Sequence, residues 1–212
     1  ITEASARVGA HLVLATNLYA FGEAQHAFTE TSELRPVSRK GRVRAELESE
    51  ALRRAEQGDF LLSVVRASDF YGPDVKDAIF GERLLVPMLA GKPGQLFGNR
   101  SSLHSYTYVP DFAATLAAAG HRAPKRPETW LVPNAPALRI PELEEVLTPL
   151  LREQGVEAAA RVTTVGPGAL RLAGLFMPAA GEVVEMLYEW NRDFVTDSSR
   201  TSEKLGIRPT PL

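Results

Sequence analysis

The 212-residue sequence contains no cysteine, which excludes disulfide bonds, thiol redox chemistry and metal sites built on cysteine. Its four histidines lack the spacing of a metal-ligand set, so we predict no metal site. No apolar run approaches the ~18 residues that a membrane-spanning helix needs. The formal net charge is -2, so no broad basic surface exists for nucleic acid or an anionic membrane. We expect a cytoplasmic globular protein that binds neither nucleic acid nor membrane.

Several well-known catalytic motifs are also missing. The sequence has no G-x-S-x-G, H-E-x-x-H or P-loop pattern, so hydrolase, zinc-protease and NTPase functions have no support. The chain begins at Ile1 rather than at a methionine, inside what reads as a helix. We therefore expect that an N-terminal portion of the biological protein is absent.

Hydrophobic patterning predicts a βαβ unit near the start of the chain. A short helix over 2–10 precedes an apolar strand over 11–16, and a longer helix over 38–57 precedes a second apolar strand over 60–66. Both strands lack alternation, which is typical of strands buried on both faces of a parallel sheet. Ligands of such sheets bind at the carboxyl ends of the strands, here 16–17 and 67–69.

The helix over 38–57 has the strongest pattern in the sequence. Val43, Leu47 and Ala51 recur every four residues and predict its apolar face. Opposite charges also recur at this spacing, and we expect ion pairs between them: Arg42–Glu46, Arg44–Glu48 and Glu50–Arg54.

The regular alternation ends after Asp69, and the rest of the chain mixes helices with short strands. We predict helices over 81–90, 110–119, 141–154, 167–175 and 180–190, strands over 129–132 and 161–165, a strand-like stretch around Tyr106 and Tyr108, and a short capped helix in the tail.

Four segments in register carry a family resemblance: LATNLYAFG, PVSRKGRVRAELE, RASDFYGP and SYTYVPDFA, at 14–22, 36–48, 66–73 and 105–113. Together they resemble the extended short-chain dehydrogenase/reductase superfamily, in its NAD-dependent epimerase/dehydratase group. The resemblance implies an α/β fold: a partial Rossmann-type doubly wound parallel sheet with a smaller C-terminal α/β substrate domain. It implies a dinucleotide-binding part at 1–69, with 108–120 packing back on it, and a mostly substrate-binding part at 70–212.

The glycine-rich turn that holds the pyrophosphate in this family has no match here. The first three βα units, roughly 90 residues at about 30 each, are expected to be missing. We favour a fragment of a longer protein. The alternative is a partial domain that binds no dinucleotide by the usual route.

In the family a Ser or Thr orients the substrate, a Tyr transfers the proton and a Lys one turn later holds the ribose. The register places Asn17, Lys40 and Arg44 at these three positions, with Thr16 as a weaker substitute for Asn17. Asn17 can still donate a hydrogen bond to a carbonyl oxygen. Lys40 could transfer a proton if its surroundings disfavour the charged form, and the Arg44 cation one turn away acts in that direction. Arg44 cannot release a proton but could hold a ribose hydroxyl.

Two other interpretations of this basic turn remain open. The cations from Arg39 to Arg44 could form an exposed helix start that pairs with Glu46 and Glu48. Alternatively, the cluster could recognise a phosphate, such as the 2′-phosphate of NADP.

The resemblance also assigns the remaining cleft residues. Ala67 and Ser68 would line the cofactor, together with Thr16, Lys40 and Arg44. Asp69 would face the substrate and disfavour anionic groups, although a turn-forming role is equally consistent. His104 stands where nucleotide-sugar epimerases often carry an Arg for the diphosphate, which argues against a UDP-sugar-type substrate. Tyr106 is a further candidate substrate contact.

Two functions follow. The first is an atypical NAD(P)-dependent oxidoreductase or epimerase-like enzyme that acts on a small polar substrate. The second is a non-catalytic NAD(P)-binding sensor or scaffold of the same fold. The segment that would decide between NAD and NADP is outside this chain. Family members often pair the helices that flank the first strand here, so a homodimer through 2–10 and 38–57 is expected.

Overall fold

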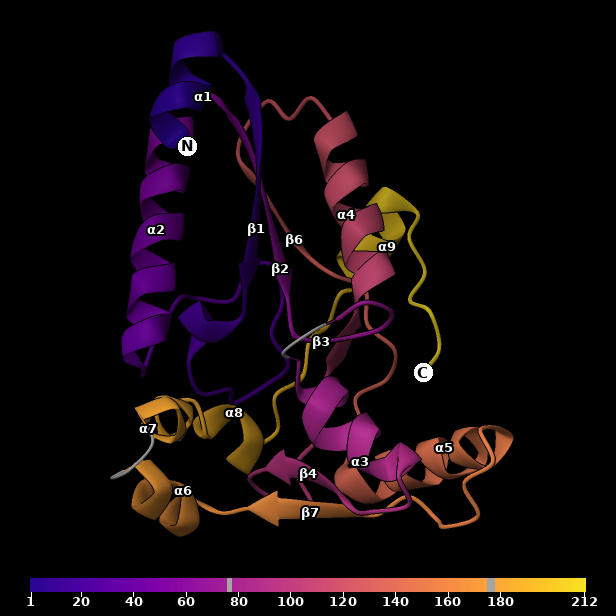
Figure 1. The fold of residues 1–212 in the computed structure, drawn as a ribbon. Helices are drawn as coiled ribbons and strands as arrows, with labels where there is room; N and C mark the ends of the chain where they lie inside the picture. The colour runs from indigo at the N-terminus through magenta and orange to yellow at the C-terminus, as the bar shows by residue number, and fades with distance from the viewer. Residues whose placement is uncertain (76–77, 175–177) are drawn as a thin grey trace.

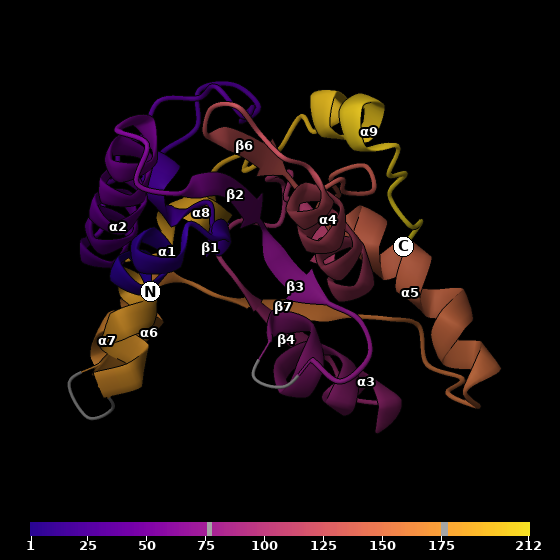
Figure 2. The same ribbon diagram turned by 90° about the horizontal axis from the view of Figure 1, so that it is seen from above.

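A computed structural model describes residues 1–75, 78–174 and 178–212 (Figure 1). Three parallel strands form its main sheet in the order β1, β2, β6, with bounds His11–Asn17, Leu61–Ala67 and Glu128–Leu131. Helices α1 and α2 (Thr2–Val8 and Arg39–Glu56) lie on one face, and α4 (Val109–His121) lies on the other, with α9 (Ser199–Leu205) beside it (Figure 2). The predicted βαβ unit and the α/β fold class are confirmed.

Strand β2 is the centre of this sheet. Its residues Leu62 and Val64 pack with Ala51 of α2, while Val65 packs on the opposite side with Trp130 of β6. Strand β2 is therefore buried on both faces, as predicted. Strand β1 is only partly buried, and Ala15 is exposed, because β1 lies at the edge of the three strands.

The structure corrects the predicted face and ion pairs of α2. Val43 and Leu47 are 50% and 58% exposed, and the buried positions are Gly41, Glu48, Ala51 and Ala55. Glu48 pairs with the buried Arg66 of β2 instead of Arg44. A cation inside a core must be paired, so Arg66 takes the carboxylate that spacing alone assigns to Arg44.

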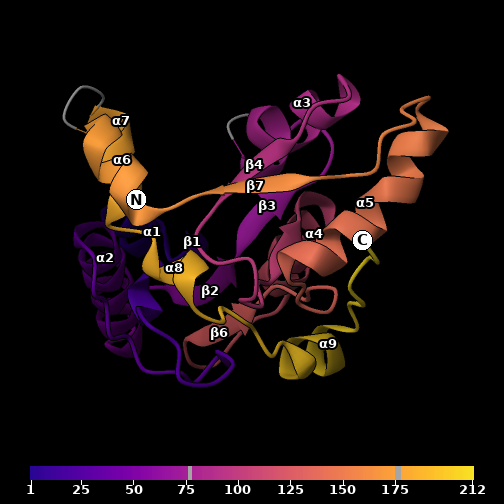
Figure 3. The same cartoon turned by 90° about the horizontal axis from the view of Figure 1, so that it is seen from below.

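Most of residues 69–108 and 138–191 lie below the carboxyl ends of the main sheet (Figures 1 and 3). Two small parallel pairs join there, β3 with β5 and β4 with β7, and β3 and β4 are missing from the sequence prediction. Their core includes Leu84, Leu96, Leu143 and Trp190. The bounds are β3 Asp69–Tyr71, β4 Gly94–Phe97, β5 Tyr106–Tyr108, β7 Val162–Val165, α5 Ile140–Glu153, α6 Pro167–Gly174, α7 Pro178–Val184 and α8 Tyr188–Asn191.

Two predicted helices are interrupted. The segment predicted as a helix over 81–90 consists of η2 (Ile79–Leu85), which is kinked at Gly81, and the short α3 (Val86–Leu89) that follows it. Pro87 lies in the first turn of α3, where its missing N–H is tolerated. The helix predicted over 180–190 is divided into α7 and α8. Leu175, the last residue of another predicted helix, lies outside the described residues.

In the described residues, no helix is both long and apolar enough to cross a membrane.

Candidate active site

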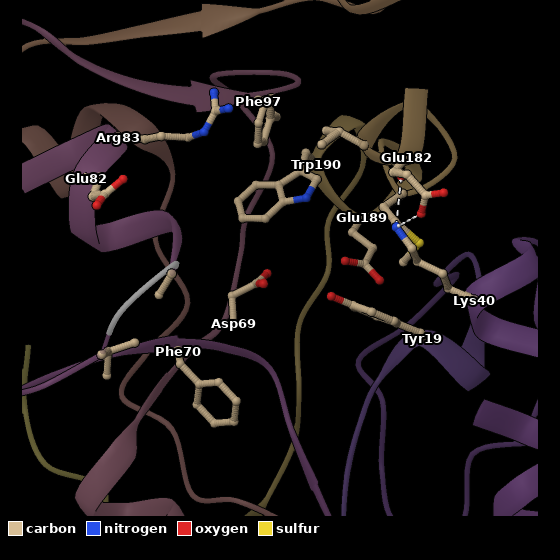
Figure 4. A pocket seen from close by; sticks show the side chains of 14 residues that line it. Tyr19, Lys40, Asp69, Phe70, Glu82, Arg83, Phe97, Glu182, Glu189 and Trp190 are labelled. Atoms are coloured by element: carbon tan, nitrogen blue, oxygen red, sulfur yellow. Dashed lines mark hydrogen bonds and ion pairs between the residues drawn. The ribbon is translucent and has the colours of Figure 1, made fainter. Parts of the chain in front are cut away.

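An open cavity of about 520 Å³ lies at the carboxyl ends of β1 and β2 (Figure 4); we call it the inner cavity. Four of its polar groups come from four different parts of the fold. Tyr19 comes from the turn η1 (Tyr19–Phe21) after β1, Lys40 from the first turn of α2, Asp69 from the start of β3, and Glu189 from α8. The other lining residues are Phe70, Val75, Ala78, Glu82, Arg83, Phe97, Glu182, Val183, Met186 and Trp190.

Tyr19 is held beside the start of α2 by two features of the sequence. The Tyr19 N–H donates to Asn17 Oδ1 at 3.2 Å, which closes a turn directly after β1. A Cβ at Gly41 would lie 2.4 Å from the Tyr19 carbonyl oxygen, so only glycine allows this close approach. Asn17 lines a small adjoining cavity of about 80 Å³ with Tyr19, Ala67, Ser68 and Asp69.

The first turn of α2 is held by acidic residues from the α7–α8 segment. Ser38 Oγ accepts from the Gly41 N–H at 2.9 Å, and a Glu185 carboxylate oxygen accepts from the Arg39 N–H at 3.0 Å. Lys40 Nζ lies 2.6 Å from Glu182 Oε2 (Figure 4) and 3.9 Å from a Glu185 oxygen. The ammonium group to which the sequence register assigns proton transfer is therefore engaged by carboxylates of the α7–α8 segment.

Arg44 is exposed and lies one turn beyond Lys40. The two side chains line a second open cavity of about 700 Å³ together with Tyr19 and Glu185. In the part of the chain that the structure describes, Arg44 has no carboxylate within salt-bridge distance. Its guanidinium therefore remains available to a ligand.

Asp69 is linked to a buried histidine below the cavity. His104 Nε2 lies 2.7 Å from Asp69 Oδ2, and His104 Nδ1 lies 3.3 Å from the Glu189 carbonyl oxygen. The imidazole stacks on Trp190 with ring centroids 4.2 Å apart. His104 is only 3% exposed and does not line the cavity, so it positions Asp69 rather than presenting a surface to a ligand.

Tyr106 is a core residue in this structure. It is 3% exposed and packs edge-on against Phe80, with ring centroids 4.7 Å apart. Burial raises the pKa of its phenol, with a further contribution from Asp69. The proposed substrate contact of Tyr106 is not supported, because its ring is enclosed by Phe80 and His104.

The three remaining candidate cofactor residues, Thr16, Ala67 and Ser68, offer little polar surface to the cavities. Ser68 donates from its N–H to Thr107 Oγ1 at 2.9 Å and from its Oγ to the Ser105 carbonyl at 2.7 Å. Ala67 is 1% exposed, so both residues reach the small cavity only in part. Thr16 is partly buried and pairs in register with Arg66, and it does not line the cavities described above.

Glu189 and Tyr19 are the two site residues that the sequence did not reveal. The Tyr188 hydroxyl lies 3.1 Å from Glu189 Oε1 and 3.4 Å from the Tyr19 carbonyl oxygen, and its one proton can go to either. Burial and the nearby Asp69 carboxylate raise the pKa of Glu189 well above its usual range. Burial also raises the pKa of Tyr19, and Asp69 adds to the shift. Figure 4 shows the Tyr19 hydroxyl and the Asp69 and Glu189 carboxyl groups pointing toward one another.

Tyr19 had a weak sequence signal, since it lies inside the segment LATNLYAFG. Glu189 had none, because a glutamate beside Trp190 in a predicted helix looks like any exposed helix residue. No group of three or more histidine, aspartate or glutamate residues within 1–75, 78–174 and 178–212 is arranged to hold a metal ion.

Comparison with known proteins gives a family and a fold. The model of the NAD dependent epimerase/dehydratase family matches residues 1–132. Among solved structures, UDP-glucuronic acid 4-epimerase from Bacillus cereus, with UDP-glucuronic acid and NAD, aligns with a TM-score of 0.75 at 18% identity. dTDP-glucose 4,6-dehydratase from Bacillus anthracis, with NAD, gives 0.75 at 16%, and MoeE5, with UDP-glucose and NAD, gives 0.73 at 21%.

Each alignment covers 99% of this chain but only 60%, 60% and 63% of those three chains, respectively. The chain thus spans less than two thirds of the length of these proteins, and at such identities the likeness shows the fold. A search of curated proteins found no match.

Proposed function

Because the chain belongs to the NAD dependent epimerase/dehydratase family, we propose that it forms the substrate-side part of an atypical NAD(P)-dependent oxidoreductase or epimerase-like enzyme. The single observation that carries this proposal is the inner cavity itself. It lies where parallel strands end, and Tyr19, Lys40 and Asp69 converge there from three different elements. Ligands of open α/β sheets bind in this position.

The donors around the second cavity fit the ribose end of a nicotinamide dinucleotide. Lys40 and Arg44 lie one turn apart on α2, line the same space and carry donors only, which suits ribose hydroxyl oxygens. When bound, the nicotinamide supplies a carbon that accepts or returns a hydride. The solved neighbours named above carry NAD, and we propose NAD or NADP for this chain.

Asn17 and Lys40 then take the positions of the family's Ser or Thr and Tyr. Asn17 uses Oδ1 to accept from Tyr19, which leaves its Nδ2 amide free to donate to a substrate carbonyl oxygen. Lys40 is the proposed proton-transfer group on α2, and Asp69 holds the substrate. For Lys40 to act, a bound substrate must replace its contact with Glu182.

A non-catalytic NAD(P)-binding sensor or scaffold is the second candidate. It is favoured by the contacts of Lys40 with Glu182 and Glu185, which occupy the side chain that an enzyme would need for proton transfer. In a sensor, Lys40 and Arg44 bind the dinucleotide and transfer no proton.

The test is a fluorescence titration of the full-length protein that contains this chain with NADH and NADPH, for the wild type and for Lys40→Ala and Arg44→Ala. Both candidate functions require that one dinucleotide binds, and both are wrong if neither does. In an enzyme, Lys40→Ala abolishes turnover of the nicotinamide with a sugar substrate. In a sensor, the same change lowers only the affinity. Arg42→Ala is the matched control, because Arg42 is exposed on α2 and lines neither cavity.

We also propose a homodimer through the predicted helix regions 2–10 and 38–57. Val43 and Leu47 of α2 and Val8 of α1 are at least half exposed, which leaves apolar surface for a partner helix. Light scattering at high protein concentration would show twice the monomer mass, and a monomer would rule this out. A cytoplasmic location remains our expectation, consistent with the lack of cysteine.

A further inference from the structure

The two carboxyl groups deepest in the inner cavity have no cationic side chain of this chain as a partner. Asp69 contacts His104 through Oδ2, and the Glu189 carboxyl contacts the Tyr188 hydroxyl through Oε1. Within the described residues, no Lys or Arg lies within salt-bridge distance of either. Glu189 is 2% exposed, lines the cavity, and has no donor to Oε2 among these residues. Because a buried polar group without a hydrogen-bond partner costs free energy, the Glu189 carboxyl is suited to bind a partner from outside the chain.

The cations that line the inner cavity are engaged elsewhere. Lys40 is bound by Glu182 at 2.6 Å. Arg83 donates to Gln95 at 3.3 Å and lies over the Phe97 ring, 5.2 Å from its centroid. The exposed side chains of Glu82 and Glu182 balance the charges of Lys40 and Arg83 at the rim of the cavity. The carboxyl groups of Asp69 and Glu189, deeper in the cavity, have no cation to balance them among the lining residues.

Aromatic rings form much of the remaining wall. Figure 4 shows the Trp190 indole projecting toward the space between Phe97 and the two carboxyl groups, with the Tyr19 phenol on the opposite side. Faces of Trp and Tyr attract cations and gain nothing from anions. Carboxylates with aromatic rings form the usual environment of a bound ammonium group, and they disfavour a phosphate or a carboxylate.

We propose that the inner cavity takes a sugar ring bearing an ammonium group, with the ammonium placed between Asp69 and Glu189. This deepens the proposed function and rests on it; the sugar ring is taken from the UDP-glucose and UDP-glucuronic acid in the solved neighbours. His104 fixes Asp69 through Oδ2, which leaves Oδ1 for the ligand. Glu189 supplies the second acidic group from α8, so β3 and α8 together select the charge of the substrate.

The test uses three probes that share one ring and differ in charge: glucosamine, glucose and glucuronic acid. Binding to the protein is measured by calorimetry at neutral pH without any nicotinamide cofactor. We expect glucosamine to bind about tenfold more tightly than glucose, and glucuronic acid to bind most weakly. Equal affinities, a preference for glucuronic acid, or no glucosamine binding at about 10 mM would overturn the proposal.

Two variants assign the preference to the cavity. Glu189→Gln and Asp69→Asn keep the side-chain size and remove the group that can become a carboxylate beside a bound ammonium, so each should reduce the glucosamine preference over glucose severalfold. Glu33→Gln is the control, since Glu33 is exposed, pairs only with Arg35 among the described residues and lies outside the cavity. A glucosamine preference that survives both cavity variants would assign it to another surface and overturn the proposal.

The NADH titration is run separately on the same samples, so the two ideas can fail independently. If glucosamine is preferred and no dinucleotide binds, the ammonium site is supported and the proposed function is wrong. If a dinucleotide binds and glucosamine is not preferred, only the ammonium site is wrong.

Discussion

Glu48 and Glu189 are both almost completely buried, at 1% and 2% exposure, yet among the described residues only Glu48 has a cationic partner. Glu48 lies in the core between α2 and β2, where it receives bonds from Arg66 Nε at 3.1 and 3.2 Å. Arg66 also donates to the Glu30 carbonyl and lies over the Phe21 ring. The Glu48 site is therefore complete within the chain.

Glu189 lies at the opposite extreme, at the deep end of the inner cavity beside Asp69. Its carboxyl group contacts the Tyr188 hydroxyl, and its pKa is raised by burial and by Asp69. A carboxyl that serves only the fold is expected to be paired, as Glu48 is. The contrast indicates that Glu189 is arranged for a ligand or a proton rather than for stability.

Removing Glu48 tests the first half of this comparison and should have the largest effect. Glu48→Ala leaves Arg66 charged and unpaired in the core, which should cost ~3–5 kcal/mol of unfolding free energy. Urea denaturation followed by circular dichroism measures the loss. Glu48→Leu combined with Arg66→Met removes both charges and should recover most of the stability. If Glu48→Ala unfolds at the urea midpoint of the wild type, the structural role of the Glu48–Arg66 pair is wrong.

Gly41 links the buried face of α2, which contains Glu48, to the inner cavity, which contains Glu189. Gly41→Ala places a Cβ 2.4 Å from the Tyr19 carbonyl oxygen, so η1 must move away from α2. We expect a loss of about 1–3 kcal/mol in unfolding free energy and weaker binding of cavity ligands. Gly168→Ala is the matched control, because Gly168 also lies in a first helical turn but has open space around its Cβ. Similar effects from both changes would show that close packing against Tyr19 is unimportant.

The sequence was sufficient for the elements that decide the fold. The unbroken apolar segment FLLSVVR predicted a strand buried on both faces, and the four-residue spacing of apolar and charged residues over 38–57 predicted α2. The motif register brought Asn17, Lys40 and Asp69 to the same edge of the sheet, where they line adjoining cavities. Their chemical roles remain predictions.

The missed features depend on contacts between distant parts of the chain. Glu189 reaches Asp69 across 120 residues, and no local pattern marks a glutamate whose neighbours in space come from β3 and η1. Strands β3 and β4 have only three and four residues, too few to show a period. The spacing of Arg44 and Glu48 was misleading because a buried Arg66 competes for the same carboxylate more strongly than an exposed neighbour.

Glu189→Gln tests the second half of the comparison and should affect stability in the opposite direction to Glu48→Ala. The raised pKa of Glu189 means that the folded protein holds a proton that the unfolded chain releases above a pH of about 4.5. This contribution to stability is present at low pH and is lost as the pH rises. The variant should therefore gain stability relative to the wild type between about pH 5 and 8.

Urea midpoints collected across this pH range measure the difference. Glu48→Gln, which leaves Arg66 without its carboxylate, is the matched control and should be destabilised throughout. A difference between Glu189→Gln and the wild type that stays constant with pH would show that Glu189 does not titrate as proposed.

The smallest effect on stability is expected at the exposed contact between Lys40 and Glu182. Both side chains are substantially open to solvent, at 40% and 60% exposure, so the attraction is screened and the ordering of two long side chains opposes it. Glu182→Gln should leave the urea midpoint unchanged within error, as should Glu33→Gln at the exposed pair with Arg35. Glu182→Gln should instead tighten NADH binding, because Lys40 is then free to donate to the dinucleotide. A midpoint shift as large as that of Glu48→Ala would mean that burial does not separate structural ion pairs from functional ones here.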